Sequence, residues 1–434
     1  MCWEVFVLDR NEYLEIVSAQ IRCKRAIPYL KEELEDHIQD QKDAYIAEGL
    51  NSFEAEMRAV KEMGDPVETG VQLDQIHRPK PERKLIIGTL LMSFIGIGIQ
   101  LLITKCYVPN EDFFWYAGVL SRQLIGTVLG IGIMLVAYYL DYSILIKWSL
   151  PCWIVLQIAI VGLCLRGVAI NGRCYQAMHL AYLGVPFLAG IVYKFRGQKG
   201  KGIIKSFICL GISIFTILMI PDLASAMTTM ICGLLVISVA VYKRWYQVER
   251  KKVLLVIWGS VTMVAVWLAG KMMYLIRFGE TSYKIERLRA WINGESWDFM
   301  HGFVGEIAEN VKAGIGMEGS TFEYVRNDYI WTYLFEYLGT WKCIILLTAF
   351  VMFMVFLLRG VLKQKNQLGY MVGIGSVAYL GIQAFIYIGM NFKFVPVAGN
   401  FMPFFSQGIT PMLVTYFYMG ILLSISRNTN VVRN

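Results

Sequence analysis

Long apolar segments follow one another over most of the chain, separated by short polar loops. Each segment is close to the ~20 residues that an α-helix needs to cross the hydrocarbon core of a bilayer. The pattern therefore predicts an all-α, polytopic membrane protein with about ten transmembrane helices. We expect them at roughly residues 84–104, 122–140, 143–165, 176–194, 203–220, 222–242, 253–276, 328–358, 366–391 and 405–425.

The first part of the chain has a different pattern. The segment KEELEDHIQDQKDAYIAEGL alternates apolar and charged residues at helical spacing, and Asn51 or Ser52 can cap a further helix, SFEAEMRAVKEMG. We therefore predict a small soluble helical prefix domain over residues 1–82, which would dock or regulate rather than carry chemistry. A membrane domain is expected over residues 83–427.

Charge follows the same division and predicts an orientation. Residues 1–83 hold 18 of the 33 acidic residues but only 11 of the 41 basic residues, so the membrane part is strongly basic. Much of this basic charge lies in two loops, KFRGQKGKGIIK and KRWYQVERKK, and in the loop after the eighth span. The positive-inside rule places these loops, and with them both termini, in the cytoplasm. Basic charge of this origin gives no reason to expect a nucleic-acid partner.

The longest loop covers residues 277–327 and is predicted to lie outside the cell. Asp328 follows it directly and opens a span, and Glu336 stands about two turns further along the helix. An ionised side chain at bilayer depth costs several kcal/mol, so each carboxylate needs an explanation. Asp328 could cap its helix, or it could face a polar substrate at the external interface. We expect Glu336 to be a buried structural residue, paired with Arg122 or with backbone donors.

Four stretches resemble motifs of the SEDS family, the RodA/FtsW/SpoVE proteins, and occur in the family's order. They are LSRQLIGTVLGIGIMLVAYYLDY, IPDLASAM, NDYIWTYLFEYLG and MNFKFVPVAGNFMPFFSQG. The resemblance covers about residues 85–427 and implies a SEDS-type membrane enzyme of the bacterial cytoplasmic membrane. Such a peptidoglycan glycosyltransferase polymerises lipid II into glycan strands at the outer face and releases undecaprenyl pyrophosphate. Its usual partner is a class B penicillin-binding protein, a transpeptidase.

The resemblance also assigns roles to charged residues. Asp328 matches the family's catalytic aspartate, which would take the proton from the acceptor sugar hydroxyl. Basic side chains would hold the leaving pyrophosphate, and the candidates are Arg122, Arg173 and Lys393. Arg122 could equally anchor the headgroup region, and Lys393 could snorkel to the interface. A divalent cation, Mg²⁺ or Mn²⁺, could assist, although no cluster of ligands marks its site.

Further polar and irregular positions lie near the expected site. Asp222 could cap the sixth span or line a cavity that binds substrate. Pro396, Gly399 and Pro403 interrupt the apolar pattern between the last two spans. Irregular backbone at membrane depth persists where it is buried in protein or lines a cavity, so these three residues are predicted to be structural.

One family motif is altered, and the alteration keeps other functions open. Gln176 matches the first residue of the family's Q-P-S-E-x-A-K element, but His179 and Tyr182 replace its glutamate and lysine. Gln176 and His179 are candidate substrate-binding residues, although His179 could simply pack in the bundle. The alternative functions are a catalytically impaired scaffold for a class B penicillin-binding protein and a flippase or transporter of lipid-linked precursors.

Overall fold

The structure is a computed structural model that describes residues 8–24, 26–79, 81–104, 113–166, 174–220, 222–278, 283–293, 307, 309–312, 325, 327–396 and 400–429. Within these ranges all regular secondary structure is helical, so the all-α prediction is confirmed. The chain divides into two compact units. One contains residues 1–82 with two short C-terminal stretches, and the other contains residues 83–362 and 368–424.

Four helices form the N-terminal part of the first unit: α1 (Arg10–Gln20), α2 (Ile27–Ala47), α3 (Ser52–Glu62) and α4 (Pro66–His77). Asn51 caps α3, because its side chain accepts a hydrogen bond from the Glu54 main-chain N–H at 2.8 Å. Asp65 caps α4 in the same way, accepting a hydrogen bond from the Val67 main-chain N–H at 2.7 Å. Tyr13, Leu14 and other apolar side chains pack between these helices as a core of their own.

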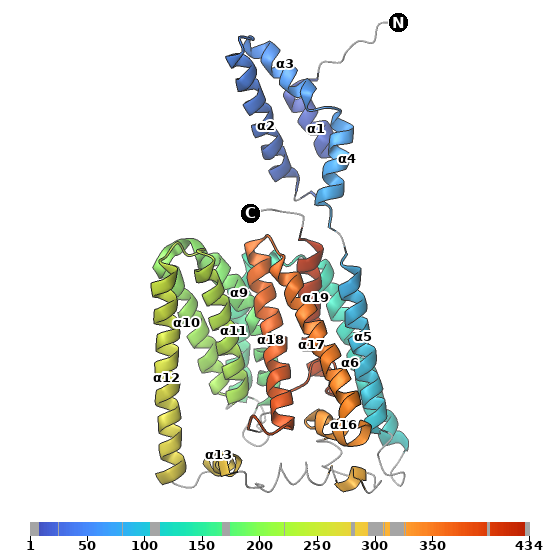
Figure 1. Ribbon diagram of the computed structural model, residues 1–434, viewed down its shortest axis with the longest axis vertical. Coiled ribbons are helices and arrows are strands. Elements are labelled where there is room, and N and C mark those ends of the chain that lie inside the picture. The colour runs from blue at the N-terminus through green and yellow to red at the C-terminus, as the bar shows by residue number, and fades with distance from the viewer. Residues whose placement is uncertain are drawn as a thin grey trace. The chain divides into compact units, whose positions relative to one another are not determined.

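The second unit contains the membrane helices (Figure 1). They are α5 (Arg83–Thr104), α6 (Phe113–Tyr139), α7 (Ile144–Arg166), α8 (Tyr175–Ala181), α9 (Gly184–Phe195), the 3₁₀ helix η1 (Arg196–Gln198), α10 (Lys199–Leu218), α11 (Leu223–Tyr242), α12 (Arg250–Phe278), α13 (Tyr283–Asn293), α16 (Ile330–Leu338), α17 (Thr340–Leu362), α18 (Gln367–Asn391) and α19 (Ile409–Arg427).

Nine helical stretches in the described part of the chain are long and apolar enough to cross a membrane. One of them, Ala177–Leu218, is 42 residues long and contains α9 and α10, which pack against each other on either side of η1. Gly202 on α10 permits this approach, since a Cβ there would lie 2.2 Å from the Phe195 carbonyl oxygen. The span predicted over 176–194 is divided into α8 and the 12-residue α9 by a turn at Tyr182 and Leu183. With α8 and α9 counted as one span and α10 as another, ten spans result, as the sequence predicts, and the chain is a multi-pass membrane protein.

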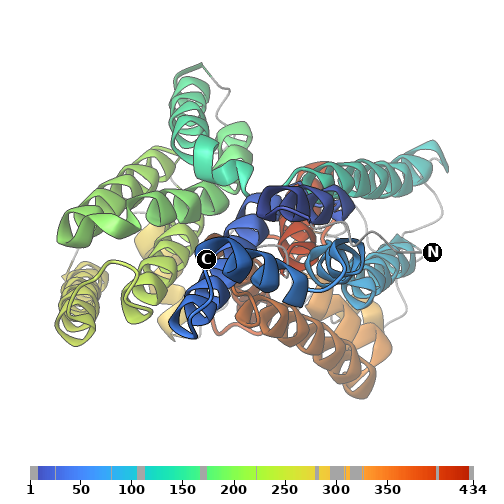
Figure 2. The ribbon, with the colours of Figure 1, turned by 90° about the horizontal axis from the view of Figure 1, so that it is seen from above.

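The membrane helices are unequally buried. Figure 2 shows α9, α10 and α11 in green and α12 in yellow on one side of the bundle, with α5, α6 and α17 on the other. Of the candidate spans, α11, α18 and α19 have the largest buried share of residues and α12 has the smallest. The interior of the unit is therefore built around α11, α18 and α19, and the ends of α18 and α19 frame the candidate site.

Candidate active site

The site is built around a break in one predicted span. The sequence predicts a single helix over residues 328–358, but the structure has the short helix α16, then Gly339, then α17. Gly339 has φ 84°, a region that favours glycine, and a Cβ there would meet nothing within 4 Å. The prediction of one helix is wrong because hydrophobic periodicity continues across a glycine whose backbone ends the helix.

Asp328 lies just before α16 and is partly exposed. The N-cap of α16 is Tyr329, so Asp328 stands one residue outside the capping position. Its main chain is held by α18, because the Asn391 side-chain amide donates to the Asp328 carbonyl oxygen at 2.9 Å. The preceding carbonyl, that of Asn327, accepts hydrogen bonds from the hydroxyls of Tyr387 at 2.8 Å and Ser406 at 3.0 Å.

Side chains of α18 also cap α16. The first N–H groups of a helix have no partner within the helix and must find one elsewhere. The Ile330 N–H donates to the Tyr387 hydroxyl at 3.2 Å, and the Thr332 N–H donates to Asn391 Oδ1 at 3.1 Å. Tyr387 and Asn391 are both buried. Side chains of α18 therefore hold both the main chain of Asp328 and the first turn of α16.

The segment between α18 and α19 supports the same turn from the other side. Phe404 has φ 69°, and the Phe405 carbonyl oxygen accepts a hydrogen bond from Gln100 Nε2 at 2.6 Å. Gly96 on α5 lies directly against this backbone, since a Cβ there would be 2.2 Å from the Phe404 carbonyl oxygen. Pro403 is buried and Pro396 partly buried. Irregular backbone at residues 400–407 is thus enclosed by protein, as the sequence predicts for Pro403.

Lys393 follows the end of α18 and is exposed, with φ 63°. Its carbonyl oxygen accepts a hydrogen bond from the Trp291 indole at 3.0 Å, which ties α13 of the long loop to the end of α18. Because Asn391 contacts the Asp328 main chain two residues before Lys393, the structure brings Lys393 and Asp328 to the same end of the bundle. Arg122 lies on α6, also exposed.

Glu336 does not lie inside the bundle. The prediction that Glu336 is buried beside Arg122 is wrong, because its side chain is 33% exposed and forms an ion pair with Lys312 at 3.9 Å. The physical reason is the orientation of α16: Trp331 and Leu334 on one face are fully buried, and Glu336 lies on the exposed face. An exposed pair of this kind contributes little to stability.

The remaining predicted site residues have different outcomes. Asp222 is buried and caps α11, accepting hydrogen bonds from the Ser225 N–H at 3.4 Å and from the Ser225 hydroxyl, as one of its two interpretations predicts. His179 lies on α8, with its ring 6.3 Å from that of Tyr182. Arg173 and Gly399 lie outside the described residues, and the structure describes only the backbone of Gln176. The roles expected for these three residues stay predictions.

Tyr182 connects His179 to the rest of the site. Its ring lies 5.5 Å from that of Phe401, in the segment that supports Asn327. Its carbonyl oxygen accepts a hydrogen bond from the Tyr418 hydroxyl at 2.7 Å. No group of three or more His, Cys, Asp and Glu side chains suited to a metal ion occurs in the described part of the chain. The polar side chains that contact the main chain of Asn327 and Asp328 are those of Tyr387, Asn391 and Ser406.

Sequence reasoning missed the residues that position Asp328, namely Tyr387, Asn391 and Ser406. Asn391 and Ser406 belong to the motif MNFKFVPVAGNFMPFFSQG, in which roles are predicted only for two prolines, a glycine and a lysine. A signal was present, since buried polar side chains within apolar spans need hydrogen-bond partners. The sequence could not show that these partners would be main-chain atoms about 60 residues earlier in the chain.

Fold and site together define a polytopic membrane protein with a carboxylate at the end of a broken span. The sequence profile of the FtsW, RodA and SpoVE cell cycle proteins matches residues 186–431. The chain belongs to this family. Stage V sporulation protein E of Bacillus subtilis is 24% identical over 383 residues, covering 81% of this chain and 98% of that protein. A probable peptidoglycan glycosyltransferase FtsW of Geobacter metallireducens is 25% identical over 374 residues, covering 79% and 94%.

Solved structures show the same fold. A chain of a peptidoglycan synthase complex, studied for its coordination of polymerization and crosslinking, aligns with a TM-score of 0.64 at 18% identity. The alignment covers 80% of this chain and 98% of that chain. The rod shape determining protein RodA of Thermus thermophilus aligns with a TM-score of 0.53 at 15% identity, covering 80% and 97%. These likenesses confirm the SEDS-type fold predicted from the four motifs.

Proposed function

We propose that this protein is a peptidoglycan glycosyltransferase that polymerises lipid II at the outer face of the cytoplasmic membrane. Relatives named as probable peptidoglycan glycosyltransferases support the reaction class. The observation that carries the proposal is the position of Asp328, a partly exposed residue directly before α16 whose carbonyl oxygen is held by the Asn391 amide of α18 at 2.9 Å. The positive-inside pattern supports placing this end of the bundle outside the cell.

In the proposed reaction, Asp328 acts as the general base. Its carboxylate takes the proton from the acceptor sugar hydroxyl while the hydroxyl oxygen bonds to C1 of the donor sugar. The bond from C1 to the pyrophosphate oxygen breaks, and undecaprenyl pyrophosphate leaves with both bonding electrons. Lys393 is the proposed cation that offsets the charge developing on the pyrophosphate, and Arg122 is a second candidate.

A divalent cation would have to be held largely by the substrate. The residues described around Asp328 offer one carboxylate and neighbouring hydroxyl and amide groups that are engaged with main-chain atoms. Mg²⁺ commonly binds through one or two carboxylates together with substrate phosphates. We propose that any Mg²⁺ or Mn²⁺ enters with the pyrophosphate, and the base step does not depend on it.

The test is polymerisation of purified lipid II by purified protein. Wild type should produce glycan polymer, and Asp328→Asn should lower the rate by about 100-fold or more, the usual effect of losing a general base. Glu336→Gln is a matched control, because it neutralises another carboxylate on the adjoining helix and should retain activity. Equal rates for wild type and Asp328→Asn would refute the assignment of Asp328.

The second candidate function is a scaffold for a class B penicillin-binding protein. It is favoured by one observation, the replacement of an expected carboxylate by His179, whose ring lies near that of Tyr182. A wild-type protein that makes no polymer but co-purifies with the transpeptidase would establish the scaffold. Movement of fluorescent lipid II across vesicles, without polymer, would instead indicate a flippase. We propose the transpeptidase as a partner in the enzymatic case as well.

A further inference from the structure

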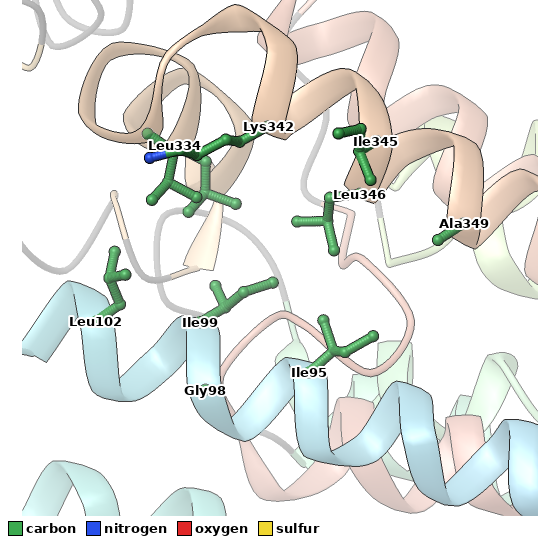
Figure 3. A pocket seen from close by; sticks show the side chains of 10 residues that line it. Ile95, Gly98, Ile99, Leu102, Leu334, Lys342, Ile345, Leu346 and Ala349 are labelled. Carbon is green, nitrogen blue, oxygen red and sulfur yellow. The ribbon is translucent and has the colours of Figure 1, made fainter.

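An apolar groove lies between α5 and the broken pair α16 and α17 (Figure 3). Its volume is about 430 Å³, within the range of about 300–1,000 Å³ typical of ligand sites. Aliphatic side chains from all three helices line it, among them Ile99, Leu102, Leu334 and Leu346. Lys342 is the single charged residue of the lining. The groove is therefore shaped for a hydrocarbon chain with one cation beside it.

The groove remains open because of how α5 packs. At Gly96, α5 lies against the backbone of Phe404, so a Cβ would be 2.2 Å from that carbonyl oxygen. At Gly98, which lines the groove, a Cβ would meet nothing within 4 Å. A larger residue at Gly98 would thus enter the groove without displacing a neighbour. A substitution at Gly98 therefore fills the groove, whereas the same substitution at Gly96 would disturb the packing of α5.

Lys342 is the third residue of α17 and is exposed. Among the described residues, no acidic side chain forms an ion pair with it. The first turn of α17 adds the partial positive charge of a helix N-terminus. Figure 3 shows Lys342 beside Leu334 at one end of the groove, and Leu102 of α5 lies at the same end. The anionic head of an amphiphile would be attracted there, with its chain along the aliphatic lining.

We propose that this groove binds the polyprenyl chain of a lipid pyrophosphate, with Lys342 against the pyrophosphate, and that this lipid is the acceptor in the transfer reaction. The inference rests on the proposed function. Leu334 and Leu338, which line the groove, belong to the short helix that begins just after Asp328. The substrate head beside Leu334 and the base before Ile330 would then lie more than one turn of α16 apart.

The place of Lys342 along α16 assigns the acceptor rather than the donor. Lys342 lies beside Leu334, and the six residues from Asp328 to Leu334 extend for roughly 9 Å at the rise of an α-helix. The pyrophosphate that leaves the donor is bonded to C1 and must be next to the hydroxyl that Asp328 deprotonates. A pyrophosphate at Lys342 is too far away to be that leaving group. It fits a lipid whose disaccharide separates its pyrophosphate from its reactive hydroxyl.

The groove accepts only the start of such a chain. Its α5 lining extends from Ile95 to Leu102, or about 10 Å along the helix. The isoprene units next to the pyrophosphate would occupy this length, and the remainder of the chain would continue into the bilayer. Recognition would therefore depend on two features together, the anionic head at Lys342 and the first isoprene units beside Gly98.

The experiment measures binding of radiolabelled undecaprenyl pyrophosphate to the full-length protein in detergent, without catalysis. Gly98→Leu should weaken binding about tenfold or more, because the new side chain occupies the space of the lipid chain. Gly132→Leu on α6 is the matched control, since a Cβ there also meets nothing within 4 Å but lies outside the groove. Lys342→Gln should weaken binding about threefold to tenfold and Lys342→Arg much less.

The possible outcomes test the lipid-binding groove and the proposed polymerase activity separately. Binding by Gly98→Leu that equals wild type would overturn the site, as would equal competition by phosphatidylglycerol, which would make the groove a general phospholipid site. Weakened binding in a protein that makes no polymer would support the groove and reject the polymerase. Normal polymerisation by Gly98→Leu, with an unchanged KM for lipid II, would reject the groove and leave the polymerase standing.

Discussion

Asn391→Ala tests the construction of the site most directly. Asn391 is 5% exposed, and its side chain bonds the Asp328 carbonyl oxygen and the Thr332 N–H at 2.9 and 3.1 Å. Its truncation leaves both main-chain groups without these partners. A buried polar group that loses its partner costs about 1–3 kcal/mol. Because Asp328 is partly exposed and water can reach its carbonyl, we expect a total of about 2–4 kcal/mol.

The assay is thermal unfolding of purified protein together with polymerisation of lipid II. For a large domain, 1 kcal/mol corresponds to about 2–4 °C in Tm, so Asn391→Ala should lower Tm by several degrees. Polymerisation should fall further, because the turn that presents Asp328 loses its support. Asn400→Ala is the matched control: Asn400 is also 5% exposed, and within the described residues its side-chain amide makes no hydrogen bond. Its Tm should change little.

A second substitution separates lost hydrogen bonds from lost volume. Asn391→Asp keeps the size of the side chain but replaces the Nδ2 donor with an oxygen that faces the carbonyls of Asp328 and Tyr387. It should be at least as destabilising as Asn391→Ala. If Asn391→Asp behaves like wild type, or if Asn400→Ala lowers Tm as much as Asn391→Ala, the hydrogen-bond explanation is wrong.

Three further predictions concern the same unit. Gly339→Ala should lower the free energy of unfolding by about 1–2 kcal/mol through backbone strain at φ 84°, and an unchanged Tm would contradict that reason. Lys312→Gln should change it by less than about 1 kcal/mol, because the pair with Glu336 is exposed. Burial raises the pKa of Tyr246 from 10.0 to about 12. The stability advantage of wild type over Tyr246→Phe should therefore be present below pH 10 and shrink as the pH rises from about 10 to 12, measured by denaturation across that range.

The membrane architecture follows from the sequence because a bilayer imposes one simple requirement. Each crossing needs about 20 apolar residues, so hydropathy alone finds the spans. The failures occur where that requirement does not apply. Gly339 divides the span that begins after Asp328, and a turn at Tyr182 and Leu183 divides the span predicted over 176–194 into α8 and α9. Both features depend on the backbone geometry of a few residues, to which an average over twenty residues is insensitive.

The sequence indicates the charged residues of the candidate site, but it does not indicate the residues that hold the main chain of Asp328. Asp328 and Lys393 stand out in the sequence because charge near a membrane span is costly and needs a reason. Glu336 stands out for the same reason, yet it lies on the exposed face of α16, while Ile330 and Trp331 on the other face are buried in the core. The sequence does not show which face of this short helix meets the bundle.

Support of Asp328 from α18 has a mechanistic consequence. A helix that is capped by its own preceding carboxylate would require that carboxylate to exchange partners during every proton transfer. Tyr387 and Asn391 bond N–H groups in the first turn of α16, and these bonds do not depend on whether the Asp328 side chain is protonated. The base and the proposed acceptor groove share α16, which begins just after Asp328 and carries Leu334 beside Lys342. A rigid α16 would then set the distance between the base and the lipid head, which is why loss of Asn391 should impair catalysis more than stability alone explains.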